Sequence, residues 1–92
     1  MKKINVEFNG GESRQNPGVA CDYMIAKTEI DGEEIELYAE ILIDDFCKEN
    51  GLDYDTDDLE AEDMIYQQLR DDIVELAREH GILENAMHFS WD

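Results

Sequence analysis

The chain has 92 residues, 42% of them hydrophobic, and a formal net charge of −18 that results from 25 Asp and Glu against 7 Lys and Arg. This length suits one domain with a modest core, and the apolar content argues against a disordered chain. The charge argues against direct binding to DNA, RNA or an anionic membrane, whose phosphates would repel it. It favours a basic protein as partner.

The N-terminus and the cysteines bear on the compartment. Met1-Lys2-Lys3 begins like a signal peptide, but polar residues between Asn5 and Gly10 interrupt any apolar segment, and no stretch reaches membrane-spanning length. Cys21 and Cys47 lie outside a CxxC spacing, which favours buried thiols in a reducing compartment over a disulfide framework. We therefore expect a protein of the cytoplasm, in a bacterial host.

A first strand is predicted close to the N-terminus. Ile4, Val6 and Phe8 alternate with polar residues, which is typical of a strand with one buried face. This strand is expected to end at Asn9-Gly10-Gly11. The Ser, Asn, Pro and Gly content of residues 12–18 then predicts a loop.

A hairpin is predicted next. Residues 19–30 are rich in β-formers and lead through Asp31-Gly32, a dipeptide typical of a type I′ turn, into a strand over residues 33–38. A two-residue turn would place four pairs of residues opposite one another: Thr28 and Ile35, Ala26 and Leu37, Lys27 and Glu36, and Glu29 and Glu34.

The spacing of apolar residues changes near Ala39. Leu42 with Phe46 and Ile43 with Cys47 are four residues apart, and Gly51 followed by an apolar residue is typical of a Schellman helix end. These features predict a first helix that begins at about Tyr38 or Glu40 and ends at Asn50.

The second predicted helix is the longest element and runs from about Leu59 to His80. Gly81-Ile82 repeats the glycine stop signal, and Asp57 or Asp58 can cap the start, with Glu60 at capping-box spacing from Asp57. Its apolar stripe consists of Ala61, Ile65, Leu69, Ile73, Leu76 and His80.

A last strand is predicted at the C-terminus, because Met87, Phe89 and Trp91 alternate with polar residues. This strand would close the sheet. The order β-β-β-α-α-β predicts an α+β fold, with a three- to four-stranded, mainly antiparallel sheet and two helices packed on one face. Residues 1–92 would form a single acidic domain.

Residues 53–63 form the densest acidic run: seven of the eleven residues are Asp or Glu, and no Lys or Arg occurs between Lys48 and Arg70. Asp53, Asp55 and Asp57 match positions 1, 3 and 5 of an EF-hand calcium loop. Position 6 is Asp58 instead of glycine, and position 12 is Met64 instead of glutamate. Weak, non-selective cation association is therefore favoured over specific calcium binding.

No other metal site and no active site is predicted. Cys21, Cys47, His80 and His88 make a formal Cys2His2 set, but they lack the short paired spacing of zinc sites. The chain contains no GxSxG elbow, P-loop, HExxH or Gly-rich dinucleotide motif. We expect no enzymatic activity, no cofactor and no metal.

Acids also recur at regular spacing on three predicted elements. Alternate residues of an extended chain lie about 6.6 Å apart, and residues four apart on a helix lie about 6 Å apart, which is comparable to the spacing of neighbouring phosphates on a nucleic-acid strand. The sets are Glu34 and Glu36 on a strand, Asp53, Asp55 and Asp57 in the acidic run, and Asp71, Glu75 and Glu79 on the second helix.

In size, charge, clustered acids and lack of catalytic motifs, the chain resembles the small acidic DNA-mimic inhibitors, the anti-CRISPR and anti-restriction proteins that phages use against host defence nucleases. The resemblance covers the whole chain and includes no diagnostic motif. It implies a non-enzymatic inhibitor whose carboxylates occupy a basic nucleic-acid-binding groove. The expected contacts are Asp53, Asp55, Asp57, Asp58, Glu60, Glu62 and Asp63, then Glu34, Glu36, Asp71 and Asp72, with Tyr54 or Tyr66 as apolar anchors.

Other classes of protein fit the same residues. One is an acidic immunity or adaptor protein that recognises a specific protein partner by shape, without mimicry of nucleic acid. A second is a domain whose acids form a generically solvated surface with no charge-driven partner. A third is a weak calcium-binding domain. Competition by DNA or RNA separates a mimic from an adaptor.

Overall fold

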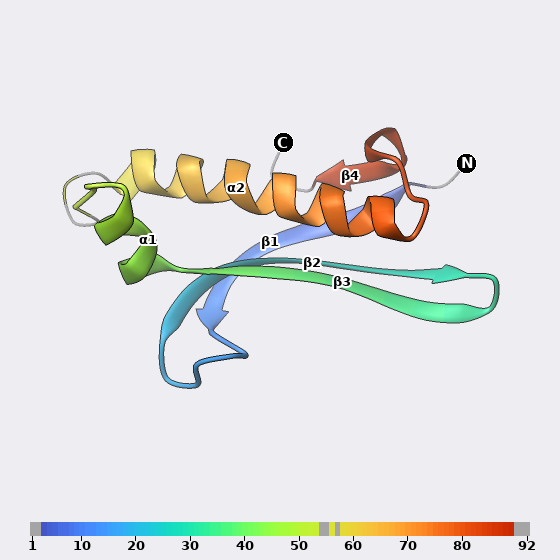
Figure 1. Cartoon of the computed structure of the whole chain (residues 1–92), viewed down its shortest axis with the longest axis horizontal. Coiled ribbons are helices and arrows are strands. Elements are labelled where there is room, and N and C mark those ends of the chain that lie inside the picture. Colours follow the sequence, from blue (N-terminus) through green and yellow to red (C-terminus); the bar gives the residue numbers. More distant parts are fainter. Residues whose placement is uncertain (1–2, 54–55, 57, 90–92) are drawn as a thin grey trace.

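The computed structural model describes residues 3–53, 56 and 58–89. Figure 1 shows the long helix lying along one face of the sheet, and no described helix covers the opposite face. The α+β class and the order β-β-β-α-α-β are confirmed. The elements are β1 (Ile4–Glu12), β2 (Ala20–Ile30), β3 (Glu33–Leu42), α1 (Ile43–Glu49), α2 (Asp58–Glu79), a 3-10 turn (Glu84–Ala86) and β4 (Met87–Phe89).

The four strands lie in the order β3-β2-β1-β4. The pairs β1–β2 and β2–β3 are antiparallel, whereas β4 runs parallel to β1. The expectation that the last strand closes the sheet is wrong, because β4 adds to the outer side of β1 and leaves β3 at the opposite edge. The sheet is therefore open, and α2 belongs to a crossover between β3 and β4, which run in the same direction.

The hairpin is confirmed in register. Asp31 has φ 52° and Gly32 has φ 81°, and these two left-handed residues are what a type I′ turn requires. All four predicted pairs across the hairpin are present. The dipeptide Asp31-Gly32 was sufficient to predict the register, because a two-residue turn leaves a single register for the strands that it joins.

The first strand is longer than predicted. Gly10 and Gly11 remain in β1, paired with Asp22 and Cys21, and the strand ends at Glu12. Gly10 lies against the Asp22 side chain, since a Cβ at Gly10 would be 3.1 Å from the Asp22 Oδ1 atom. The glycine therefore permits a close approach within the sheet and does not end the strand.

The boundary between β3 and α1 also differs from the prediction. β3 continues to Leu42, which pairs with Cys21, and α1 begins only at Ile43. The apolar residues of segment 38–43 fit both the alternation of a strand and the four-residue spacing of a helix. Pairing with the long strand β2 stabilises the strand conformation in this segment.

Both helices end as the glycines predicted. Gly51 has φ 66° and Gly81 has φ 76°. After α1, the Leu52 N–H donates to the Cys47 carbonyl at 2.8 Å, and after α2, the Ile82 N–H donates to the Ala77 carbonyl at 2.9 Å. These are the 6→1 hydrogen bonds of the Schellman motif. The predicted Asp57 cap lies outside the described residues.

The core lies between α2 and the inner face of the sheet. The sheet contributes Val6, Met24, Ala26 and Leu37. The apolar stripe predicted for α2 is wrong in its last turn: Ala77 is buried, whereas Leu76 is half-buried and His80 is exposed. The fully buried row of α2 is Ala61, Ile65, Leu69, Ile73 and Ala77, each four residues after the last. None of the helices in the described part of the chain is long and apolar enough to span a membrane.

Candidate functional site

The acids divide unequally along the chain. Residues 43–92, which include both helices, hold 16 Asp and Glu against 3 Lys and Arg. Residues 1–42, which include the three long strands, hold 9 against 4. Most of the net negative charge therefore belongs to the half of the chain that covers the inner face of the sheet.

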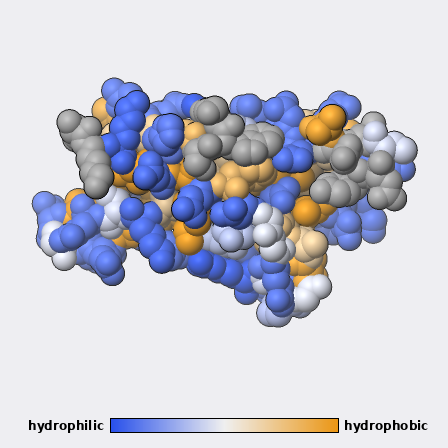
Figure 2. All heavy atoms as spheres, turned by 180° about the vertical axis from the view of Figure 1, so that it is seen from behind, coloured by the Kyte–Doolittle hydropathy of each residue, from blue (hydrophilic) through white to orange (hydrophobic). Residues whose placement is uncertain are grey.

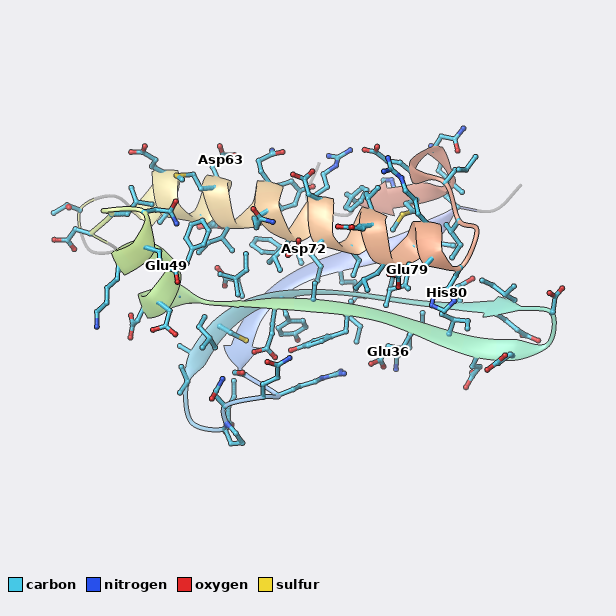
Figure 3. The ribbon with its side chains drawn as sticks, viewed as in Figure 1. Glu36, Glu49, Asp63, Asp72, Glu79 and His80 are labelled. Atoms are coloured by element: carbon cyan, nitrogen blue, oxygen red, sulfur yellow. The ribbon has the colours of Figure 1, made fainter. Side chains whose placement is uncertain are left out.

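Four acids form an exposed row along α2. Asp63, Asp71, Glu75 and Glu79 are all exposed, and Gln67 fills the remaining position of this four-residue repeat. The row spans about 24 Å at 1.5 Å per residue. The ion pairs found between described residues do not involve these four carboxylates. Figure 3 shows Asp63 on the side of α2 away from the sheet and Glu79 on the other side of the helix, because each four-residue step turns about 40° around an α-helix.

The acidic run 53–63 lies at the connection from α1 to α2 and in the first turns of α2. Asp53, Glu60 and Asp63 are exposed, and Glu62 is half-buried. Of the other predicted contacts, Asp58 opens α2, while Tyr54, Asp55 and Asp57 lie outside the described residues. Further acids on α1 extend the exposed set, which we call the acidic helical layer: Asp44, Asp45, Glu49, Asp53, Glu60, Asp63, Asp71, Glu75 and Glu79. Figure 2 shows hydrophilic residues over much of the visible helical side.

The start of α2 bears on the calcium hypothesis. A calcium loop beginning at Asp53 would extend to Met64, but α2 already begins at Asp58, position 6 of that loop. Residues 58–64 are therefore helical and cannot wrap around an ion as the second half of an EF-hand loop does.

Two predicted contacts lie elsewhere. Glu34 and Glu36 are two residues apart on β3 and point to the face of the sheet opposite α2, as Figure 3 shows for Glu36. The Arg14 Nη1 atom donates a hydrogen bond to Glu36 Oε1 at 2.7 Å. This hydrogen bond holds the pKa of Glu36 below its usual value. Glu34 and Glu36 therefore do not share a surface with the acids of α2.

Two further predicted contacts are less accessible than expected. Tyr66, expected as an apolar anchor, is only 3% exposed, and its ring packs edge-on against Phe8 with 5.3 Å between centroids. Its side chain is therefore part of the core and cannot anchor a partner in this structure. Asp72 is half-buried and accepts a hydrogen bond from Gln68 Nε2 at 3.0 Å, whereas its neighbour Asp71 is exposed.

A polar network on the face opposite α2 was not predicted. Ser13, in the loop after β1, is 3% exposed and donates a hydrogen bond to the Glu40 carboxylate. The Arg14 N–H and the Tyr38 hydroxyl also donate to Glu40, at 3.0 and 2.9 Å. The Arg14 guanidinium lies 3.9 Å from the centre of the Tyr38 ring. The network therefore fastens the β1–β2 loop to β3.

The network affects two ionisable groups. Burial, reinforced by the hydrogen bond to Glu40, raises the pKa of Tyr38 to about 12. Partial burial alone would raise the pKa of Glu40, but hydrogen bonds from Ser13, Tyr38 and the backbone outweigh burial and hold this pKa below its usual value. The alternation of Glu36, Tyr38 and Glu40 was the only sequence signal for this cluster, and it names no partner in the loop.

Asp22 provides a test of the packing between β2 and α2. Burial, and next the nearby negative charge of Glu62, raise the pKa of Asp22 above its usual value. A carboxyl with a raised pKa stabilises the fold when protonated, and this stabilisation is lost as the pH rises through the folded-state pKa. Asp22→Asn should therefore raise the free energy of unfolding at pH 7 slightly, on the order of 0.5 kcal/mol for a half-exposed group.

The measurement for Asp22→Asn is urea denaturation at pH 7 and pH 4. The advantage of the variant over the natural chain should shrink at pH 4, because the raised pKa of Asp22 favours its protonated form in the folded state as the pH falls. Glu7→Gln is the control, because Glu7 is exposed on β1 and stands opposite Ile25, so that its replacement removes neither a buried carboxyl nor an acid facing another acid. A variant that is less stable than the natural chain at pH 7 would contradict the expectation.

The described residues contain no group of three or more His, Cys, Asp or Glu side chains placed to hold a metal ion. Cys21 and Cys47 are both buried and neither forms a disulfide, as predicted. Protein-family models, curated proteins and solved structures were compared with this chain, and none of them matches it. The acidic helical layer is thus interpreted from its own geometry.

Proposed function

We propose that the protein is a non-enzymatic inhibitor that binds a basic, nucleic-acid-binding groove of a host defence nuclease through its acidic helical layer. The observation that carries the proposal is the exposed set Asp71, Glu75 and Glu79, which lie within about 80° of one another around α2. Like charges four residues apart on a helix destabilise it by about 0.2–0.5 kcal/mol per pair. A groove lined by Arg and Lys would relieve this repulsion.

The physical basis of the proposed complex is charge-assisted hydrogen bonding and counterion release. Carboxylates that face guanidinium groups form short, strong hydrogen bonds, and a nucleic-acid-binding groove already carries the cations that phosphates would neutralise. Such a complex should form quickly and weaken steeply with salt.

An apolar anchor is also available beside the acids. Leu59 lies in the first turn of α2, next to Glu60, and is 79% exposed. Anchors of this kind contribute to binding when they enter a pocket and exclude water. Leu59 thus takes the place of Tyr66 in the proposal.

The proposal is tested with two variants that remove equal charge from different elements. The first is Asp71→Asn, Glu75→Gln, Glu79→Gln on α2, and the second is Glu29→Gln, Glu33→Gln, Glu34→Gln on the hairpin, where all three acids are exposed. Nucleases are captured from bacterial lysate at low salt, purified, and assayed for cleavage in the presence of each protein. The α2 variant should inhibit between about threefold and a hundredfold more weakly, from about 0.2–1 kcal/mol for each of three exposed pairs, whereas the hairpin variant should stay within about twofold.

Competition with duplex DNA or RNA separates mimicry from other modes of binding. Nucleic acid should displace the natural chain from the captured nuclease, and higher salt should weaken the complex. A complex that persists in saturating nucleic acid would instead support an adaptor. Equal effects of the α2 and hairpin variants would show that the row on α2 is not the contact surface.

A further inference from the structure

Strand β3 forms one edge of the sheet, with β2 on one side and no strand on the other. Figure 1 shows β3 from the hairpin turn to α1, and no described helix or strand lies in front of it in that view. The two-residue turn makes Ile30 and Glu33 a hydrogen-bonded pair, and the register continues without a bulge to Leu42. Every second residue from Glu33 therefore directs its N–H and C=O groups to β2. The residues between them direct theirs to the open edge: Glu34, Glu36, Tyr38 and Glu40.

The same four residues carry the acidic side chains of this edge. Their side chains lie on the sheet face opposite α2, because Leu37 between them points into the core. Glu34 is exposed and stands directly opposite Glu29 on β2, and like charges in this position destabilise a sheet. A cation placed beside Glu34 would relieve this repulsion.

The core is incompletely covered along β3. Leu37 is 1% exposed, but its neighbours on the inner face, Ile35 and Ala39, are only half-buried, although both pack against the core. Met24, which lies one strand further in and pairs with Ala39, is 0% exposed. A further strand with apolar residues on its inner face would bury Ile35 and Ala39 more fully.

Contacts within the chain show which chemistry the acids of β3 accept. The Arg14 guanidinium donates to Glu36 at 2.7 Å and lies 3.9 Å from the centre of the Tyr38 ring, and the Arg14 N–H donates to Glu40 at 3.0 Å. These contacts use side chains of β3. Among the described residues, the backbone hydrogen bonds formed outside helices and strands do not involve β3.

We propose that the edge of β3 binds an extended, cationic segment of a second protein, which adds to the sheet as a fifth strand antiparallel to β3. Residues of the segment opposite Glu34 and Glu36 are Lys or Arg, and the residues between them are apolar and cover Ile35 and Ala39. A second copy of β3 does not fit, because its own glutamates would meet these acids and each chain carries a net charge of −18. The acids thus reject other copies of the chain and select a basic strand.

The test is fluorescence anisotropy of a labelled peptide of about nine alternating Lys and Val residues, enough to span residues 34–42, titrated with the full chain. Binding should be saturable. In an antiparallel pair the Lys residues, which share a face with Glu34 and Glu36, direct their N–H groups to β3. N-methylation of the Lys backbone should therefore raise the dissociation constant by about tenfold or more, whereas N-methylation of the Val backbone should change it by less than about threefold. Equal affinities of the three peptides would show plain charge attraction and overturn the inference.

Two charge reversals locate the contact on the chain. Glu34→Lys should weaken peptide binding by about threefold or more, and it should fold because the lysine then faces Glu29. Glu7→Lys is the control: Glu7 is exposed on β1, which β2 separates from β3, and its reversal should change affinity by less than about twofold. Equal weakening by both variants would overturn the inference. This assay uses neither a nuclease nor the acidic helical layer, so it fails independently of the proposed function.

Amide hydrogen exchange measured by NMR gives a readout for individual residues of β3. In the chain alone, the N–H groups of Glu34 and Glu36 should exchange faster than those of Ile35 and Leu37, which are bonded to β2. A saturating amount of the Lys-Val peptide should slow the exchange of Glu34 and Glu36 by about tenfold or more. Bound peptide that leaves these two rates unchanged would contradict pairing at this edge.

Discussion

Leu69→Ala should lower the free energy of unfolding by about 2–5 kcal/mol, the range for large-to-small substitutions in well-packed cores. Leu69 is 0% exposed and stands at the middle of the fully buried row of α2, above the inner face of the sheet. The substitution loses the transfer free energy of the buried carbons and leaves a cavity that the strands can fill only in part. A domain of this size is stabilised by about 5–15 kcal/mol in total, so the loss should be evident in urea denaturation.

Leu83→Ala is the matched control for Leu69→Ala. The residue type and the number of atoms removed are the same, but Leu83 is 64% exposed and follows the end of α2. Its loss should change the free energy of unfolding by no more than about 0.5 kcal/mol. Similar losses in the two variants would mean that α2 does not pack on the sheet through the row that contains Leu69.

The parts of the fold that could be predicted are those that a few neighbouring residues determine. Asp31-Gly32 determines the register of the hairpin because both residues adopt left-handed conformations that few others tolerate. Gly51 and Gly81 mark the helix ends for the same reason. The buried row of α2 followed from its spacing, apart from the last turn, where Ala77 takes the place of His80 in the core.

The unpredicted parts depend on contacts between residues far apart in the chain. Tyr66 lies on the flank of the predicted stripe, and its ring packs against Phe8 on β1, which is far away in the chain. In the sequence, Glu36 resembles the acids of α2. Its side chain, however, lies on the sheet face opposite α2 and forms an ion pair with Arg14, which is 22 residues away in the chain. A count of acids therefore could not show which of them share a surface, because that depends on how α2 lies on the sheet.

Glu40→Ala should lower the free energy of unfolding by about 2–4 kcal/mol, because three donors would lose their acceptor together. Ser13 is buried, and unsatisfied buried donors cost about 1–3 kcal/mol each, although water can reach part of the site. Urea denaturation at pH 7 measures the loss. Glu34→Ala is the control: Glu34 is exposed on the same strand and stands opposite Glu29, so its removal should be neutral or slightly stabilising.

Glu40→Gln separates the charge of Glu40 from its role as an acceptor. Since the folded-state pKa of Glu40 is lowered, its carboxylate stabilises the fold fully above the ordinary value of 4.5, and this stabilisation is lost as the pH falls through the folded-state pKa. The natural chain should therefore exceed Glu40→Gln in stability at pH 7, and the difference should shrink below about pH 4.5. Other carboxyls titrate in both proteins, so the difference reports Glu40 alone. A difference that stays constant down to pH 3 would show that the network recognises the shape of the side chain and not its charge.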